Sequence, residues 1–393
     1  MDRIYMDNAA TTAICPEALS AMLPCFGDHF GNASSIHGTG RDARKTLEEA
    51  RRTVAECLGA KAQEIYFTSG GTESDNWAIK GAAYANRKKG SHIITSQIEH
   101  HAVLHTCEWL EKQGFRVTYL PVDEYGLVNP RDVEAAITDQ TILISIMAAN
   151  NEIGTIEPIS EIGKIAKAHK IIFHCDAVQA VGAIPVDVDS WGVDMLSLSG
   201  HKFHGPKGIG ALYIRTGTKV DIFLHGGAQE RGRRASTENV PGAVGMAAAM
   251  KKAVDSIEEN GMRLIAMRDR LIQGILSRIP YSRLNGHSLY RLPGNVNVSI
   301  QYVEGEALLL RLDLAGIAGS SGSACTSGSL DPSHVLLAIG LPHEVAHGSL
   351  RLSLSDGNTE EEVDEVLRVL PDIVEKLRAM SPMYDDFIRG QRK

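Results

Sequence analysis

The chain has 393 residues. A single hydrophobic core usually stops growing below this length, so we expect one large domain and one smaller domain. Hydrophobic residues make up 43% of the chain and charged residues 22%, which argues against disordered, collagenous and coiled-coil proteins. The formal charge is -8 and long basic runs are missing, so neither nucleic acid nor an anionic membrane is expected as the main partner.

Neither the start of the chain nor its cysteines suggest secretion. The first residues, MDRIYMDNAATT, lack the apolar region of a signal peptide, and no apolar stretch reaches about 18 residues. The cysteines are scattered, without a CxxC pair or zinc-finger spacing, which is typical of reduced thiols. We therefore expect a cytoplasmic protein. The cysteines are Cys15, Cys25, Cys57, Cys107, Cys175 and Cys325.

Short apolar runs alternate with helical patterns over the first half of the chain. Strands separated by helices of about 10 to 18 residues favour a mainly parallel sheet with helices on both faces, so the sequence predicts an α/β fold. The predicted strands are EIYFT (64–68), SHIITS (91–96), FRVTYLPV (115–122), TILISIMAA (141–149), KIIFHCDA (170–177), DMLSLS (194–199) and GALYIR (210–215).

Helical patterns flank these strands and dominate the second half. Apolar residues at three- and four-residue steps predict an amphipathic helix over Arg41–Gly59. The capping-box pair Thr359 and Glu362 predicts the start of another helix, which we expect Pro371 to kink. Residues 247–279 predict one or two long helices, and a new strand pattern, GNVNVSI, follows them. We place the domain change near residue 260.

Two strand ends carry residues that could hold a phosphorylated, flat cofactor. The first strand runs into Ser69–Thr72 and then a helix, a pattern in which backbone amides cradle a phosphate. Glycine-rich turns of this kind are common, so this signal is weak by itself. His100 follows the next strand and could stack on a ring, although a loop histidine is usually a hydrogen-bonded surface residue.

Two later strand ends carry an acid and a lysine. Asp176 could keep a pyridinium nitrogen protonated, which makes pyridoxal phosphate an electron sink, or it could simply cap a helix. Lys202, in LSLSGHKFHGPKGIG, lies on a tight turn that suits a Schiff-base lysine, although a surface loop lysine is the alternative. Since open α/β sheets bind ligands at successive strand ends, these residues together predict a pyridoxal phosphate site.

Cys325 lies in GSSGSACTSGSLD, residues 319–331, among glycine and small polar residues. Such a segment has high conformational freedom and little apolar anchoring. A thiol on it could enter a site, accept an atom and leave again. The alternative is a flexible linker with an incidental cysteine.

The motifs in this order resemble the cysteine desulfurases of the NifS/IscS type, from YMDNAATT to LRLSLS. The motifs that carry the resemblance are SGGTESDN, EHHAVL, NNEIGT, DAVQ, SGHKFHGPKG, GGAQERGRRAST and SSGSACTSGSLDPSHVL. The resemblance implies a fold-type I pyridoxal phosphate enzyme with a mainly parallel seven-stranded sheet flanked by helices. It also implies a large domain over 15–260, and a smaller α+β domain over 1–14 and 261–393 that carries the 319–331 loop.

The activity implied is that of a homodimeric sulfurtransferase. It would take sulfur from L-cysteine, release alanine and leave a persulfide on Cys325. The sulfur would pass to an iron-sulfur scaffold protein or another acceptor for iron-sulfur cluster assembly. Cys325 could also be a transient metal ligand in a cluster shared with the scaffold.

The resemblance also implies roles residue by residue. Lys202 forms the Schiff base, Asp176 pairs with the pyridine nitrogen, and His100 stacks on the ring and takes part in catalysis. Arg351, on an alternating strand pattern, binds the substrate carboxylate through its planar fork, whereas without the family a solvated strand arginine is as good an interpretation. Asn151 is implied to contact both the cofactor and the substrate, and Thr237 to contact the cofactor of the other subunit. The other residues implied to contact the cofactor are Gly71, Thr72, Gln179, Ser199 and His201.

Two other functions stay open at this point. A selenocysteine lyase or another fold-type I pyridoxal phosphate enzyme would use Lys202 and Asp176 in the same way without needing Cys325. A non-enzymatic sulfur-carrier scaffold would need only the 319–331 loop.

Overall fold

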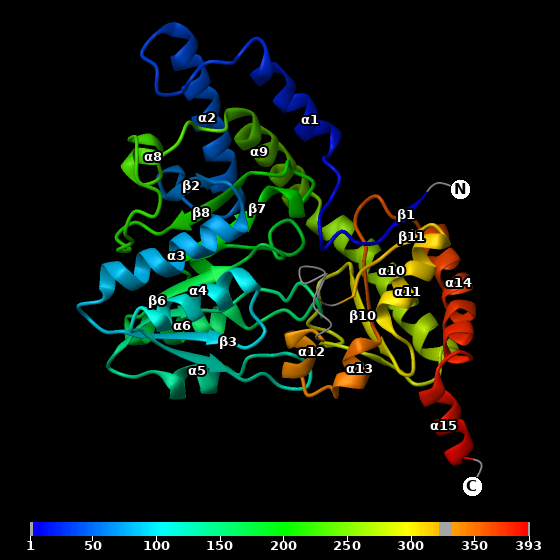
Figure 1. The fold of residues 1–393 in the computed structure, drawn as a ribbon. Coiled ribbons are helices and arrows are strands. Elements are labelled where there is room, and N and C mark those ends of the chain that lie inside the picture. Colours follow the sequence, from blue (N-terminus) through cyan, green and yellow to red (C-terminus); the bar gives the residue numbers. More distant parts are fainter. Residues whose placement is uncertain (1–2, 322–331, 392–393) are drawn as a thin grey trace.

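The structure is a computed structural model, and it describes residues 3–321 and 332–391 (Figure 1). Cys325 and most of the 319–331 loop lie outside the described residues. Within the described part, no helix is long and apolar enough to cross a membrane.

A seven-stranded sheet forms the centre of the larger part of the molecule, in the order β2-β8-β7-β6-β5-β3-β4. Four of its strand pairs are parallel: β4 with β3, β3 with β5, β5 with β6, and β6 with β7. β8 is antiparallel to both β7 and β2, because a short turn rather than a crossover helix returns the chain after β7. The mainly parallel sheet is confirmed. Its strands are β2 (Ile65–Thr68), β3 (His92–Ser96), β4 (Arg116–Leu120), β5 (Thr141–Ser145), β6 (Ile172–Asp176), β7 (Met195–Ser199) and β8 (Gly210–Ile214).

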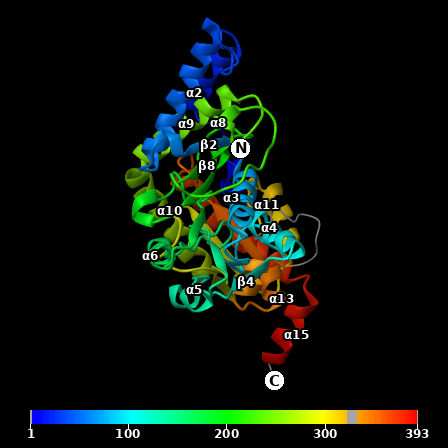
Figure 2. The ribbon, with the colours of Figure 1, turned by 90° about the vertical axis from the view of Figure 1, so that its left-hand side faces the viewer.

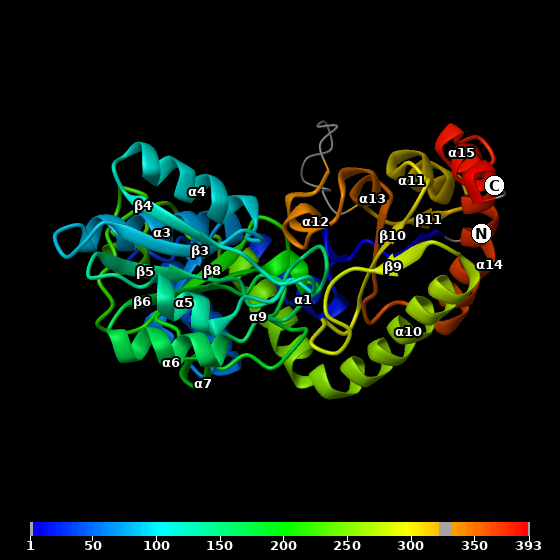
Figure 3. The same cartoon turned by 90° about the horizontal axis from the view of Figure 1, so that it is seen from below.

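Helices cover both faces of this sheet, as Figure 3 shows for α4 on one side and α6 on the other. The helices before residue 256 are α1 (Pro16–Met22), α2 (Gly38–Cys57), α3 (Gly71–Asn86), α4 (His101–Lys112), α5 (Pro130–Ala136), α6 (Ile159–His169), α7 (Val188–Trp191), α8 (Gln229–Gly232) and α9 (Val240–Asp255), with the 3-10 turns η1 (Leu23–Phe26), η2 (Ala62–Glu64) and η3 (Gly200–Lys202).

Neighbouring positions along a strand point to opposite faces of the sheet. Ile94 and Phe173 therefore pack in one buried cluster with α2, α6 and α9. Ile93 and Met195 pack in a second buried cluster, with α3 and α4. Their chain neighbours Ile94 and Leu196 belong to the first cluster. Both faces are apolar, which explains why the strand sequences are nearly continuous hydrophobic runs.

A smaller antiparallel sheet, in the order β12-β10-β9, packs against α10, α11 and α14 (Figure 3). β1 and β11 form a two-stranded parallel sheet beside it. The last helix, α15, projects from the rest of the chain (Figure 2). The elements are β1 (Ile4–Tyr5), α10 (Ile257–Arg278), β9 (Ser282–Leu284), β10 (Asn295–Ile300), α11 (Gly305–Leu314), β11 (Ile317–Ala318), α12 (His334–Ala338), α13 (His343–His347), β12 (Ser349–Ser353), α14 (Glu360–Arg378) and α15 (Pro382–Gln391).

Most of the expected elements are present. Two helices, α9 and α10, occupy the region for which one or two were expected, and β10 begins directly after Gly294. The capping box of Thr359 and Glu362 starts α14. α14 runs as one helix with Pro371 in its interior. The division into domains near residue 260 stays a prediction.

One buried ion pair ties α2 to the segment that contains α8. Arg51 is 2% exposed, and its Nη1 and Nη2 lie 2.6 and 2.8 Å from the carboxylate of Glu230. The same guanidinium donates to the carbonyl of Ile65 at 2.9 Å. Removing one partner of a buried pair leaves the other charge uncompensated.

We predict that Arg51→Ala lowers the free energy of unfolding by about 3 to 5 kcal/mol, measured by chemical denaturation. Arg52→Ala is the matched control, because Arg52 is exposed and lies 3.9 Å from Glu49. The control should change stability by less than about 1 kcal/mol. Equal losses in the two variants would contradict the structural role of the pair.

Candidate active site

One cavity of about 350 Å³ is lined by residues that follow the carboxyl ends of β3, β5, β6 and β7. This is where open α/β sheets bind ligands. The cavity brings together all the predicted site residues within the described part of the chain except Thr237. They are Gly71, Thr72, His100, Asn151, Asp176, Gln179, Ser199, His201, Lys202 and Arg351.

Lys202 ends the η3 turn and points to a segment from the other end of the chain. Its Nζ donates to the carbonyl oxygens of Ala9 at 2.5 Å and Ala10 at 2.9 Å. The backbone and hydroxyl of Thr12 both donate to the carbonyl of His201, at 3.0 and 2.9 Å. The lysine is therefore part of a cavity wall and not a surface loop residue.

His100 caps the N-terminus of α4 and presents a neutral ring to the cavity. Its Nδ1 accepts a hydrogen bond from the N–H of Ala102 at 3.1 Å, which leaves the proton of the neutral ring on Nε2. Burial, followed by the charge of Lys202, lowers the pKa of His100 to about 4. A flat, uncharged ring can stack on a ligand without placing a second cation beside Lys202.

Asp176, the last residue of β6, is a buried acid. Its Oδ1 accepts a hydrogen bond from the N–H of Val178 at 2.9 Å, so it closes the turn that follows β6. The alternative of a helix cap is wrong, because a turn and not a helix follows Asp176. Burial raises the pKa of Asp176 to about 6, against the effects of that bond and of Lys202. Asp176 has no salt bridge within the described residues. A ligand that brings a protonated ring nitrogen fits this position.

The start of α3 fits an anionic group. The helix is long enough to have a strong N-terminal dipole, and its first backbone amides have no intrahelical partners. A Cβ added at Gly71 would lie 2.7 Å from Val178 and 3.7 Å from Ser199, so glycine lets another group approach closely. Thr72 and His201 line the same space. Burial, then Lys202, lowers the pKa of His201 to about 4, so it would contact an anion as a neutral hydrogen-bonding group.

Arg351 lies on β12 and is 2% exposed, which excludes the solvated arginine of the alternative interpretation. Its Nη2 lies 3.0 Å from the carboxylate of Asp7, and its Nη1 donates to the carbonyl of Asn151 at 2.9 Å. Each terminal nitrogen carries a second N–H, so the fork keeps donors for a ligand carboxylate.

The sequence pattern did not identify every residue of the cavity wall. Asp75 follows Thr72 by three residues, a helical step that places both on one face of α3. Ala9 and Ala10 are far away in sequence, and nothing local predicts their role. The wall residues that were missed are Ala9, Ala10, Asp75, His101, Met147, Ala149, Glu152, Val178 and His334.

Thr237 is exposed and does not line the cavity. The N-cap of α9, two residues later, is Asn239. Its predicted contact across a dimer stays a prediction. The role of Cys325, including that of metal ligand, lies outside the described residues, and in the described part no cluster of His, Cys, Asp or Glu could hold a metal ion.

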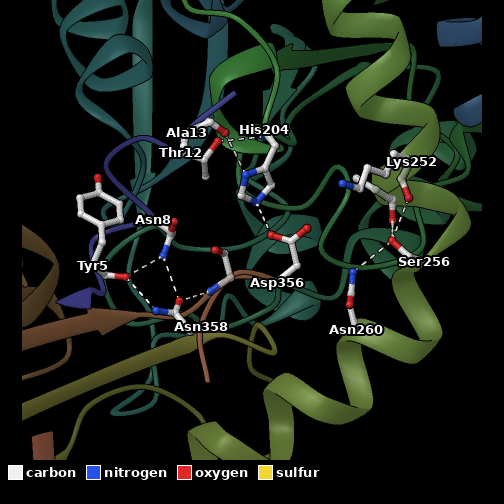
Figure 4. A network of polar contacts seen from close by, with 12 residues as sticks. Tyr5, Asn8, Thr12, Ala13, His204, Lys252, Ser256, Asn260, Asp356 and Asn358 are labelled. Carbon is white, nitrogen blue, oxygen red and sulfur yellow. Dashed lines mark hydrogen bonds and ion pairs between the residues drawn. The ribbon is translucent and has the colours of Figure 1, made fainter. Parts of the chain in front are cut away.

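The N-terminal segment that holds Lys202 is itself tied to the smaller part of the molecule (Figure 4). Nε2 of His204 lies 3.1 Å from Asp356, and its Nδ1 lies 3.0 Å from the carbonyl of Ala13. A carbonyl and an ionised carboxylate both only accept hydrogen bonds. Both ring nitrogens of His204 therefore donate, and the ring is protonated. Asn8 donates to the carbonyl of Ser353 at 2.8 Å.

Comparisons with known proteins agree with this geometry. Residues 4–366 match the model of the aminotransferase class-V family. The chain is 62% identical to the cysteine desulfurase IscS of Methanosarcina thermophila, over 97% of this chain and 94% of that protein. Among solved structures it is similar to a NifS-like protein, with a TM-score of 0.90, 40% identity and coverage of 95% and 99% of the two chains. It is also similar to SspA in complex with cysteine, with a TM-score of 0.80, 39% identity and coverage of 89% and 98%.

We predict that the His204–Asp356 ion pair makes stability depend on pH. Burial opposes the charge on His204, but the hydrogen bond and charge of Asp356 outweigh it and raise the pKa of His204. The contribution is therefore complete below the ordinary histidine pKa of about 6.5 and is lost as pH rises through the raised value. His204→Gln should cost more unfolding free energy at about pH 6 than at about pH 9.

His169→Gln is the control for this comparison. His169 lies 3.5 Å from Glu134, but both side chains are well exposed. Denaturation of this variant should show little difference from the wild type at either pH. A loss for His204→Gln that is the same at both pH values would rule out the ion pair as its cause.

Proposed function

Because the chain belongs to the class-V aminotransferase family, we propose that it is a pyridoxal phosphate-dependent cysteine desulfurase. It converts L-cysteine to L-alanine and keeps the sulfur as a persulfide. The membership confirms the family resemblance carried by the motifs, together with the fold class and cofactor that it implies.

One observation carries this proposal. A lysine, a buried acid and a neutral histidine from three different strand ends line a single cavity, together with an arginine from the smaller sheet. This set matches the parts of an amino acid bound to a pyridine ring: a nitrogen to be protonated, a face to be covered and a carboxylate to be bound. The high identity to a cysteine desulfurase supports the choice of amino acid.

When bound, pyridoxal phosphate supplies an electron sink that lets bonds at the substrate carbons break. Asp176 would hold the proton on the ring nitrogen, and His100 would cover one face of the ring. The amides at the start of α3, with Thr72, Ser199 and His201, would hold the phosphate. Gln179 would bond to the ring hydroxyl. Its Nε2 already donates to the carbonyl of Ala9 at 3.0 Å, and this contact orients the side chain.

Lys202 would be the residue that holds the cofactor and that moves a proton at the Cα of the substrate. Both tasks require an amine at a fixed place that can lose its proton. The carbonyls of Ala9 and Ala10 hold Nζ at one position, so the amine would be at a fixed place for both tasks.

Cys325 accepts the sulfur in the last chemical step. Its thiolate attacks the substrate sulfur, and the new S–S bond forms as the Cβ–S bond breaks. The electron pair of that bond remains on the carbon skeleton, which takes up protons and leaves as alanine. Since an ordinary thiol is only a few per cent ionised at pH 7, cationic groups in the cavity would assist the attack.

The finer biological context follows from this activity. A persulfide must be handed on, so the partner is an iron-sulfur scaffold protein or another sulfur acceptor. We also propose a cytoplasmic homodimer in which Thr237 reaches the cofactor phosphate of the other subunit.

We predict that Arg351→Ala raises the KM for cysteine by about tenfold or more, because a charge-assisted contact with a carboxylate contributes roughly 1.5 to 3 kcal/mol. The absorption spectrum of the bound cofactor should not change. Arg283→Ala is the control, since Arg283 is on the same small sheet but not in the cavity wall. An unchanged KM would mean that Arg351 has only its structural bonds to Asp7 and Asn151.

The proposed function is tested with Cys325→Ala. This variant should bind cysteine and show the spectral changes of bound substrate, but form no alanine from it. It should keep appreciable activity with selenocysteine, because selenium is a better leaving group and needs less help from a nucleophile. Cys57→Ala, at the end of α2, is the control and should behave like the wild type. Alanine produced from cysteine at the normal rate by Cys325→Ala would refute the persulfide mechanism.

A further inference from the structure

A second buried acid, Asp75, lies in the cavity wall with Asp176. Asp75 belongs to the first turns of α3 and is 1% exposed, while Asp176 ends β6 and is 5% exposed. Both line the cavity. The proposed function gives Asp176 a partner in the ring nitrogen but leaves Asp75 without a role.

The fold places Asp75 against the same face of the sheet as Asp176. Phe173 and Cys175 point to the α2, α6 and α9 side, so the alternate residues His174 and Asp176 point to the α3 side. Nε2 of His174 lies 3.6 Å from Oδ1 of Asp75, too far for a hydrogen bond. That nitrogen is 2.9 Å from Oγ of Ser197 instead.

The surroundings of Asp75 do not suit a negative charge. Its Oδ1 is buried and has no hydrogen-bond partner within the described residues, and an ionised carboxylate with an unpartnered oxygen is costly to bury. A hydrogen bond with Ser197 favours the charged form but is outweighed by burial. His174 cannot supply a positive charge, because burial lowers its pKa to about 3. Lys202 interacts with Asp176, and Glu99, also fully buried, adds another acid nearby.

The titration of the two acids agrees with this geometry. Burial, followed by the charge of Asp176, raises the pKa of Asp75 well above the ordinary value of an aspartate. Burial raises the pKa of Asp176 to about 6. Because the charge of Asp176 is one cause of the raised pKa of Asp75, an ionised Asp176 disfavours the ionisation of Asp75.

The start of α3 gives a chemical reason for an uncharged Asp75. Two acids lie in the first turns of the helix whose N-terminus would hold the cofactor phosphate, and negative charge there would repel it. Glu73 is neutralised by Arg234, whose Nε lies 2.8 Å from its carboxylate. The imidazole that lies 3.6 Å from Asp75, that of His174, is neutral and cannot compensate a negative charge, so protonation of Asp75 itself is what neutralises it.

We infer that Asp75 is a positioning residue that stays uncharged, so that the cavity presents one carboxylate, Asp176, to the ring nitrogen and no additional negative charge to the phosphate. This inference rests on the proposed function. Asp75 would favour cofactor binding by being uncharged next to Asp176 and the α3 N-terminus. It would not contact the reacting atoms.

The first test is infrared spectroscopy of the full chain near neutral pH, before and after pyridoxal phosphate is added. Wild-type protein should show the carbonyl band of a protonated aspartic acid, identified by its shift on labelling aspartate with carbon-13. Asp75→Asn should lack this band, and pyridoxal phosphate should shift it in the wild type. The absence of any protonated aspartate band in the wild type would overturn the inference even if the variant does not fold.

Glu157→Gln is the matched control. Glu157 is 4% exposed, has an unpartnered Oε1 and a raised pKa caused by burial, but it does not line the cavity. The variant should lose a glutamic acid band that pyridoxal phosphate does not shift. If the cofactor leaves the Asp75 band unshifted as well, Asp75 does not sense the cofactor and the inference is wrong.

The second test is the pH profile of pyridoxal phosphate affinity in the apoprotein. Asp75→Asn replaces a neutral acid by a neutral amide, so near pH 7 its Kd should stay within about threefold of the wild-type value. A tenfold or larger change in either direction would show that Asp75 is charged there and overturn the inference. Failure of the wild type to bind pyridoxal phosphate would refute the proposed function instead, while the infrared band would still report on Asp75.

Discussion

The contact between Lys202 and the N-terminal segment is the constraint on which the site depends. Nζ of Lys202 and Nε2 of Gln179 both donate to the carbonyl of Ala9. Two residues earlier, Asp7 holds Arg351 of the smaller sheet. A stretch of three residues therefore links Lys202 to Arg351. The hydrogen bond from Arg351 to the carbonyl of Asn151 is a second link, between β12 and the segment after β5, so both contacts align the two sheets.

Control of charge is the second feature of the cavity. His100 and His201 are neutral because burial and the nearby lysine disfavour their protonation. The charged groups are Asp176 and Arg351, and each lies where a ligand group of opposite charge would bind: a protonated ring nitrogen and a carboxylate. The buried Arg51–Glu230 pair, away from the cavity, shows the other solution, in which the two charges compensate each other within the protein.

The sequence predicted the fold well where local pattern and burial agree. The strand runs are hydrophobic on both faces because helices cover both faces, and parallel pairing follows from the helices between them. The order of the sheet and the antiparallel direction of β8 depend on how connections cross the sheet, and no single run encodes that. The continuation of α14 through Pro371 also depends on tertiary structure. Packing of the apolar face of this helix outweighs the local tendency of proline to interrupt a helix.

By itself, the sequence determined the residues at the strand ends, and with them the family, the cofactor and the place of Lys202, Asp176, His100 and Arg351. Those residues are recognisable because the chemistry demands particular side chains at the ends of consecutive elements. Tertiary structure alone decided that Ala9 and Ala10 hold the lysine and that Asp75 lies buried beside Asp176. Backbone carbonyls have no signature in sequence, and the protonation of an acid depends on the burial and charges contributed by distant segments.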